Sequence, residues 1–225
     1  MVWVKICGVR DVESARLVAE CRPDAIGLNF YPGSPRAVSA EVARSIARGL
    51  PAGIEAVGVF VNSAAADVAE TVRSCALHRV QFHGDEPPQL LAEFHRLSPP
   101  TPIIRAWRFG PQGLRALQDY VARCQTLGVP VAAVLVDAHL PGRYGGTGVA
   151  LPWDEVRCDY ASRSLPPLIL AGGLNADNVA AAVTSIEPWG VDVASGVESA
   201  PGVKDAELVA RFVNGARGTT KKPHT

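Results

Sequence analysis

The sequence lacks an excess of charge of either sign, a basic block and a long hydrophobic run. Its 225 residues carry 22 Lys and Arg against 22 Asp and Glu, so the formal net charge is zero. A neutral chain attracts nucleic acid and anionic membranes only weakly. No apolar run approaches the ~18 residues of a membrane-spanning helix. We therefore expect neither a nucleic-acid partner nor a membrane partner for this chain.

Cysteine is sparse, because the chain has only five such residues, an odd number, with no C-x-x-C motif among them. This spacing indicates neither a zinc cluster nor a disulfide framework. Reduced thiols are typical of the cytosol. The N-terminus carries Lys5 after four residues and lacks the apolar core of a signal peptide. The sequence therefore predicts a cytoplasmic protein.

What the chain does have is the composition of a globular protein, with 48% apolar and 20% charged residues. Short apolar runs alternate along it with longer amphipathic runs. The short runs are continuous rather than alternating, as strands buried on both faces of a parallel sheet are. The predicted strands are residues 2–7, 25–30, 55–60, 79–82, 103–107, 132–136, 168–171 and 191–194.

Helical patterns lie between these strands, about 27 residues apart on average, which is close to one βαβ step. The predicted helices include 12–21, 40–50, 64–75, 87–98, 112–127, 176–185 and 204–216. No linker interrupts the series. We expect an α/β fold with a single (β/α)8 TIM barrel over residues 1–217 and a polar, flexible tail over 218–225. An open doubly wound sheet is the alternative, but no G-x-G-x-x-G motif follows the first strand.

In such a barrel the active site lies at the carboxyl ends of the strands. Cys7 ends the first predicted strand and Asp137 follows the sixth. A thiol is usually a small buried hydrophobe, whereas a catalytic thiol needs access and a lowered pKa. A carboxylate at the end of an apolar strand is costly to bury unless it is used or paired, with Arg143 or His139 for example. Both residues are candidates for catalysis.

Glycine turns follow the seventh and eighth strands, where barrels often hold a phosphate on backbone N–H groups. These turns contain Gly172, Gly173, Ser195 and Gly196, and the alternative is that they are tight turns only. A third glycine loop, with Gly145, Gly146 and Gly148, follows the sixth strand. It is either a loop that closes over a ligand or a mobile surface loop.

His83 and Arg36 are further candidates at the same end of the barrel. His83 could be a base, a metal ligand or a structural histidine, and its only companions for a metal are His139 and Asp137. We therefore expect no metal. Arg36 lies in a loop stiffened by Pro35, where its planar guanidinium suits a ligand carboxylate, or it is a solvated surface arginine.

Nine motifs occur in order over the chain up to about Ala216. They are Lys5-Ile6-Cys7-Gly8, Phe30-Tyr31-Pro32-Gly33-Ser34-Pro35-Arg36, Gly58-Val59-Phe60-Val61-Asn62, Gln81-Phe82-His83-Gly84-Asp85, Val136-Asp137-Ala138, Gly145-Gly146-Thr147-Gly148, Leu170-Ala171-Gly172-Gly173-Leu174, Gly190-Val191-Asp192 with Glu198, and Pro201-Gly202-Val203-Lys204-Asp205. Together they resemble the motifs of phosphoribosylanthranilate isomerase, a barrel enzyme of tryptophan biosynthesis.

The resemblance implies a cofactor-free Amadori rearrangement of N-(5′-phosphoribosyl)anthranilate to 1-(2-carboxyphenylamino)-1-deoxyribulose 5-phosphate. By position, Cys7 matches the family's general base and Asp137 its general acid. Arg36 matches the contact to the anthranilate carboxylate, and His83 lines the same pocket. The turns after strands seven and eight match the phosphate site. The expected partner is this small phosphosugar, and both a monomer and a homodimer stay open.

Other readings remain. A barrel that binds a phosphosugar without turnover needs neither Cys7 nor Asp137. An aldolase-type indole synthase needs a lysine at a strand end. The candidate is Lys5, which lies two residues before Cys7 in the first strand and points the same way as that thiol. A metal-dependent epimerase needs ligands that the sequence does not offer. Because its side chain points the same way as that of Cys7, Lys5 could also assist this thiol.

Overall fold

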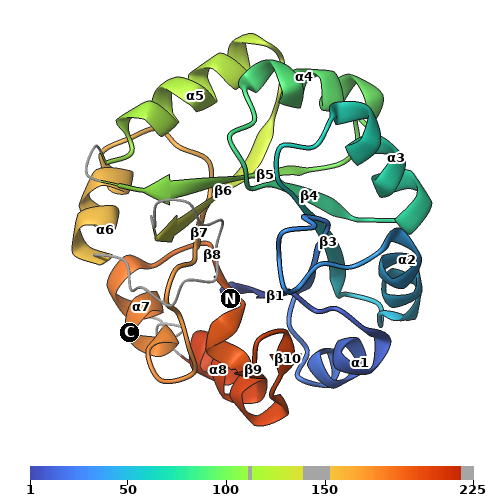
Figure 1. Ribbon diagram of the computed structural model, residues 1–225. Helices are drawn as coiled ribbons and strands as arrows, with labels where there is room; N and C mark the ends of the chain where they lie inside the picture. Colours follow the sequence, from blue (N-terminus) through green and yellow to red (C-terminus); the bar gives the residue numbers. More distant parts are fainter. Residues whose placement is uncertain (111–112, 139–152, 219–225) are drawn as a thin grey trace.

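The computed structural model describes residues 1–110, 113–138 and 153–218, in which eight parallel strands form a closed barrel (Figure 1). The barrel strands are β1 (Trp3–Cys7), β2 (Ala25–Asn29), β3 (Glu55–Phe60), β4 (Arg79–Phe82), β5 (Ile103–Phe109), β6 (Val131–Ala138), β7 (Leu168–Leu170) and β8 (Gly190–Val193). Each strand pairs with the next in chain order, and β8 closes the ring on β1. The expected (β/α)8 barrel is confirmed, and the open doubly wound sheet is excluded.

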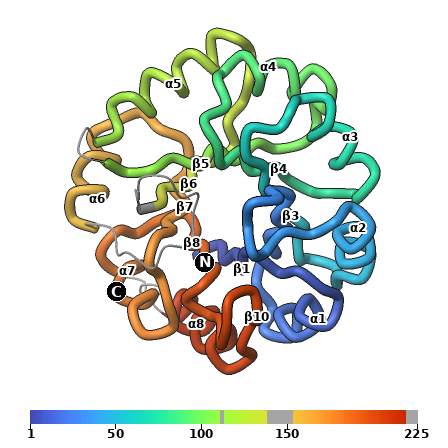
Figure 2. Tube along the Cα trace, viewed as in Figure 1, coloured from blue at the N-terminus to red at the C-terminus, as the bar shows by residue number. Residues whose placement is uncertain are grey.

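Helices cover the outside of the barrel, and the tube in Figure 2 follows them around the ring in chain order. They are α1 (Val12–Glu20), α2 (Ala40–Gly49), α3 (Ala65–Cys75), α4 (Pro88–Leu97), α5 (Arg115–Thr126), α6 (Trp153–Ala161), α7 (Val179–Ile186) and α8 (Ala206–Gly218). None of the described helices is long and apolar enough to span a membrane.

Side-chain alternation divides the core in two. The outward positions of the strands pack against the helices in a large apolar cluster, to which Val4 and Ile6 of β1 belong. The inward positions form a second, smaller cluster inside the barrel. Its members are Ala25, Val57, Ile104, Ala106, Ala133, Leu135, Ile169 and Ala171. Because inward and outward residues alternate along each strand, the parity of these positions fixes which side chains reach the mouth.

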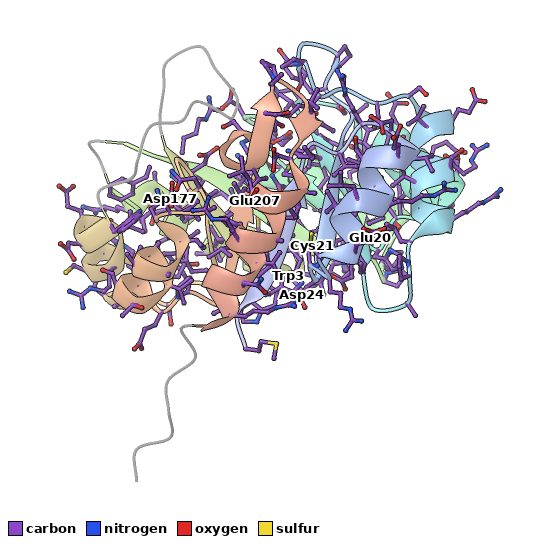
Figure 3. All side chains as sticks on the ribbon, turned by 90° about the horizontal axis from the view of Figure 1, so that it is seen from below. Trp3, Glu20, Cys21, Asp24, Asp177 and Glu207 are labelled. Carbon is purple, nitrogen blue, oxygen red and sulfur yellow. The ribbon has the colours of Figure 1, made fainter. Side chains whose placement is uncertain are left out.

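The parallel strands give the barrel two different ends, which the side view in Figure 3 separates. Trp3, at the start of β1, and Asp24, just before β2, lie toward one end. Asp177, in the turn after β7, lies nearer the other end. The carboxyl ends of the strands, and with them Cys7 and Asp137, therefore belong to the Asp177 end.

Three helices begin two or three residues later than the sequence predicts, and α5, which begins at Arg115 rather than at residue 112, is one of them. The helix expected from residue 176 begins at Val179, because the Asn175 side chain accepts hydrogen bonds from the N–H groups of Asp177 (2.9 Å) and Asn178 (3.1 Å) and forms a turn first. The helix expected from residue 204 begins at Ala206. Residue 204 instead belongs to a hairpin of β9 (Glu198–Ala200) and β10 (Val203–Lys204), which follows the short 3-10 helix η1 (Ser195–Val197).

Candidate active site

The parity of the strands brings predicted site residues from separate strands to one mouth. Ala133 and Leu135 face the barrel interior, so Asp137, two residues further along β6, faces inward as well. Arg108 of β5 stands in register with Asp137. On β1 the outward residues are Val4 and Ile6, which leaves Cys7 inward at the carboxyl end.

Asp137 and His83 approach each other across this mouth. Asp137 is 5% exposed, and its Oδ2 lies 3.6 Å from His83 Nε2, which is an electrostatic contact longer than a hydrogen bond. His83 Nδ1 lies 2.7 Å from Nε2 of the fully buried Gln81. If that amide nitrogen donates, the neutral ring carries its proton on Nε2, toward Asp137. The pair therefore joins a carboxyl group to an oriented imidazole.

Cys7 occupies a site made by a glycine and a buried ion pair. Gly27 of β2 leaves room for the thiol, because a Cβ at that position would lie 2.7 Å from Cys7 Sγ. Two residues before Cys7, the fully buried Lys5 donates from Nζ to Asp192 Oδ1 at 2.6 Å. Burial raises the pKa of the Cys7 thiol, and the charge of Lys5 offsets only part of that rise. Lys5 is therefore the largest influence that favours the ionised thiol, and burial opposes it.

Arg36 is ordered by an acidic residue from the other end of the sequence. Its Nε and Nη2 donate to Glu198 at 2.8 and 2.7 Å, and its aliphatic part packs against Gly8, the residue after Cys7. These hydrogen bonds raise the pKa of Arg36 despite its burial. The arginine is thus not a solvated surface residue, and the described hydrogen bonds leave Nη1 to meet a ligand.

Glu198 also binds Lys204, which connects the β9–β10 hairpin to the site. Lys204 Nζ donates to Glu198 at 2.7 Å and to the Ala194 carbonyl at 2.9 Å. Burial raises the pKa of Glu198, but the hydrogen bonds from Arg36 and Lys204 outweigh it and hold that pKa below its ordinary value. Sequence reasoning did not assign Glu198 or Lys204. Both residues lie in the motifs that carry the family resemblance, which was the one signal that could have found them.

The glycine turns after β7 and β8 lie against each other. Gly172 and Gly173 have φ of +76° and +70°, a left-handed backbone that glycine adopts without strain. Asn178 donates from its side chain to the Gly173 carbonyl at 2.9 Å. Gly196, in η1, abuts the backbone of Leu174, where any Cβ would collide. The two turns that contain Gly172, Gly173, Ser195 and Gly196 therefore form one continuous surface.

Other predicted features lie elsewhere. Gly145, Gly146 and Gly148, like His139 and Arg143, fall outside the described residues. Across residues 1–110, 113–138 and 153–218, no three His, Cys, Asp or Glu side chains are grouped to hold a metal ion.

A cavity of about 730 Å³ opens beside the mouth, between the loop after β4 and the start of α5, and its lining includes Arg105, Trp107 and Tyr120. Neither Cys7 nor Asp137 lines this cavity. We place the reaction at the mouth rather than in this cavity. Arg105, in its lining, already donates hydrogen bonds to Glu86 at 2.9 Å and to the carbonyls of Phe82 and Gly84, both at 3.0 Å.

Known proteins resemble the chain along nearly its whole length. The family model for N-(5′-phosphoribosyl)anthranilate (PRA) isomerase matches residues 4–215. The N-(5′-phosphoribosyl)anthranilate isomerase of Acidithiobacillus ferrooxidans is 45% identical over 220 residues, covering 97% of this chain and 99% of that protein.

Solved structures agree with the sequence relatives. The crystal structure of phosphoribosyl anthranilate isomerase from Thermotoga maritima has a TM-score of 0.84 at 34% identity, covering 97% of this chain and 100% of that one. A structure of the isomerase in complex with reduced 1-(o-carboxyphenylamino)-1-deoxyribulose 5-phosphate has a TM-score of 0.81 at 32% identity, with the same coverage.

Proposed function

This chain belongs to the N-(5′-phosphoribosyl)anthranilate isomerase family, and on that premise we propose that Cys7 is the general base and Asp137 the general acid of its reaction. The enzyme is an aldose–ketose isomerase of tryptophan biosynthesis. It converts N-(5′-phosphoribosyl)anthranilate to 1-(2-carboxyphenylamino)-1-deoxyribulose 5-phosphate by an Amadori rearrangement. The observation that carries the assignment is that β1 and β6 each end in an inward-facing ionisable group at the same mouth.

The first step opens the ribose ring. Asp137, as the protonated acid, gives its proton to the ring oxygen while the bond from that oxygen to C1 breaks. The nitrogen lone pair forms a double bond to C1, so the open form is a protonated Schiff base. His83, 3.6 Å from Asp137, orients the carboxyl group and lines the pocket.

The second step moves a proton from carbon. The positive Schiff base acidifies the proton on C2, and the Cys7 thiolate removes it, which gives an enolamine. The enolamine loses its hydroxyl proton and gains one at C1, so the product is the ketone. Cys7 and Asp137 act on different atoms of the sugar, which suits groups on strands that are not neighbours in the ring.

Anchors at both ends of the substrate hold its centre between the two groups. Arg36 binds the anthranilate carboxylate through the part of its guanidinium that Glu198 does not occupy. The surface formed by the turns after β7 and β8 binds the phosphate through backbone N–H groups of Gly172, Gly173, Ser195 and Gly196.

The reaction proceeds on this proposal without metal or cofactor. Purified protein should consume fluorescent phosphoribosylanthranilate in the presence of excess chelator at its full rate. Loss of turnover in chelator, restored by a divalent cation, would contradict the proposal, and no turnover from pH 6 to 9 would indicate a binding protein without catalysis.

We also propose a cytoplasmic location, which the role in amino-acid biosynthesis supports, and a monomer or homodimer as the working form. Cell fractionation tests the first, and light scattering on the purified protein tests the second. A related enzyme, from Thermotoga maritima, is described as dimeric.

A further inference from the structure

A lysine is buried in the interior of the barrel directly below the thiol. Lys5 has no exposed surface and lies on the same inward face of β1 as Cys7. It stands in register with Asp192 of β8, and the two side chains form an ion pair of 2.6 Å. The ammonium group thus lies at the junction where the last strand of the barrel meets the first.

This ion pair stands out against its surroundings, because the neighbouring inward positions form an apolar cluster that includes Ala25, Val57 and Ile169. A buried ion pair is a poor way to stabilise a core, since well-packed apolar side chains of similar volume often serve as well or better. The pair therefore calls for a role other than packing, and Cys7 is the ionisable group directly above it.

Lys5 acts on Cys7 by its charge. Its side chain lies two residues before the thiol on the same inward face of β1, and the ammonium group attracts the ionised form of that thiol. Asp192 keeps Lys5 charged in return: burial lowers the pKa of the lysine, but the charges of Asp192 and Cys7 outweigh burial and raise that pKa above its ordinary value. A charged ammonium group is thereby held on the same face of β1 as the sulfur.

We propose that Lys5, held by Asp192, is a positioning residue that stabilises the thiolate of Cys7 for proton abstraction. This inference rests on the proposed role of Cys7 as the general base. Lys5 touches no substrate atom in this account, and it acts only through the sulfur atom.

Other charges around the thiol act in the same balance. Lys204 of β10 favours the thiolate, Asp192 of β8 disfavours it, and Arg36 also interacts with Cys7 by charge. Burial is the largest influence and raises the pKa of Cys7, with Lys5 the largest opposing one. Removing Lys5 should therefore leave a thiol that ionises at still higher pH.

The test measures ionisation of Cys7 without substrate. Below the thiol pKa, the rate of alkylation by iodoacetamide is proportional to the thiolate fraction, so a rise of one pKa unit slows it tenfold. The variant is Lys5→Met combined with Asp192→Leu, which removes both charges and leaves neither unpaired. Mass spectrometry of the Cys7 peptide, from pH 7 to 9, should show alkylation several-fold slower than in the wild type, because the loss of Lys5 outweighs the loss of the opposing charge of Asp192.

Cys21 provides a control within the same molecule. Burial and Glu20 raise its pKa, and neither Lys5 nor Asp192 contributes. Its alkylation profile should therefore coincide in the variant and the wild type. Circular dichroism and thermal unfolding confirm that the variant is folded.

A second variant gives the same sign and stands if the first does not fold. Lys5→Gln removes the positive charge while its amide group still donates a hydrogen bond to Asp192, so Cys7 should react at least ~10-fold more slowly. Rates for Cys7 within about twofold of the wild type in a folded variant would overturn the inference. Because no substrate is used, this outcome is distinct from failure of Cys7 as the base, which turnover by Cys7→Ala tests.

Discussion

Glu198 holds the guanidinium of Arg36 by two hydrogen bonds, 2.8 Å from Nε and 2.7 Å from Nη2, although the two residues lie 162 positions apart in the sequence. The bidentate geometry fixes the plane of the guanidinium. Lys204 and the N–H of Gly202 donate to the same carboxylate, at 2.7 and 3.1 Å. The hairpin after β8 therefore determines where a residue of the loop after β2 presents its charge to the substrate.

Replacing Glu198→Gln should weaken substrate binding more than chemistry. The glutamine amide can accept from only one of the two Arg36 nitrogens, so the guanidinium loses its fixed orientation. We expect KM to rise about tenfold, the scale of one hydrogen bond to a charged group, with kcat changed less than about threefold. Glu70→Gln, in the exposed pair with Arg73, is the matched control and should change neither constant. An unchanged KM in Glu198→Gln would contradict the role of Arg36 as the carboxylate anchor.

Glu198 should also make stability depend on pH. Its folded-state pKa lies below the ordinary value of 4.5, so its ionised form stabilises the fold above that pH. The stabilisation is lost as the pH falls from about 4.5 through the lower folded-state pKa. The difference in Tm between wild type and Glu198→Gln should therefore shrink as the pH falls from 6 to 3. A constant difference over that range would show that the charge of Glu198 does not contribute.

The buried pair of Arg105 and Glu86 should matter for stability. Arg105 is 4% exposed and Glu86 1%, and Glu86 also accepts from the N–H groups of Asn62 (2.8 Å) and Gly84 (2.9 Å). Arg105→Met leaves a buried carboxylate without its cation and should cost about 3–5 kcal/mol in urea unfolding. The exposed Arg73 gives the control, since Arg73→Met should cost less than about 0.5 kcal/mol. Equal costs for both would contradict a structural role for the buried pair.

Contact between the two glycine turns should be required for phosphate binding. In Gly196→Ala, the new Cβ would collide with the carbonyl of Leu174, so the turns after β7 and β8 must separate. We expect the inhibition constant of inorganic phosphate and the KM for substrate both to rise at least ~10-fold. Gly49→Ala, at a helical position with no atom within 4 Å of the new Cβ, should leave both unchanged. Normal phosphate inhibition in Gly196→Ala would remove these turns from the site.

The barrel itself could be predicted from the sequence, because each strand is a local apolar run and every helix except α6 follows a local amphipathic pattern. The details that could not be predicted depend on contacts with another segment of the chain. Nothing in the run that ends at Trp107 indicates that β5 continues to Phe109, since the extension pairs Arg108 with Asp137 of the next strand. The sequence pattern placed Lys204 at the start of a helix. Lys204 lies instead in the β9–β10 hairpin, where it binds Glu198, and this contact exists only once the hairpin has formed.

The site was predictable only where a strand end marks it. Cys7, His83 and Asp137 each follow or end an apolar run, and strand parity then turns them toward one mouth. Glu198 and Asp192 carry no such mark, because their partners Arg36 and Lys5 lie 162 and 187 residues away in the sequence. The raised pKa of Cys7 also follows from burial among distant strands, which composition and spacing do not reveal.

The central claim is that Cys7 takes a proton from carbon and Asp137 gives one to the ring oxygen. The most direct measurement is kcat for phosphoribosylanthranilate in Cys7→Ala and Asp137→Asn, with Cys21→Ala as the matched thiol control. Each of the first two should lower kcat at least ~10²-fold, the contribution of a lost acid or base, while Cys21→Ala keeps the wild-type value. Turnover near the wild-type rate in either Cys7→Ala or Asp137→Asn would contradict the assignment of that residue.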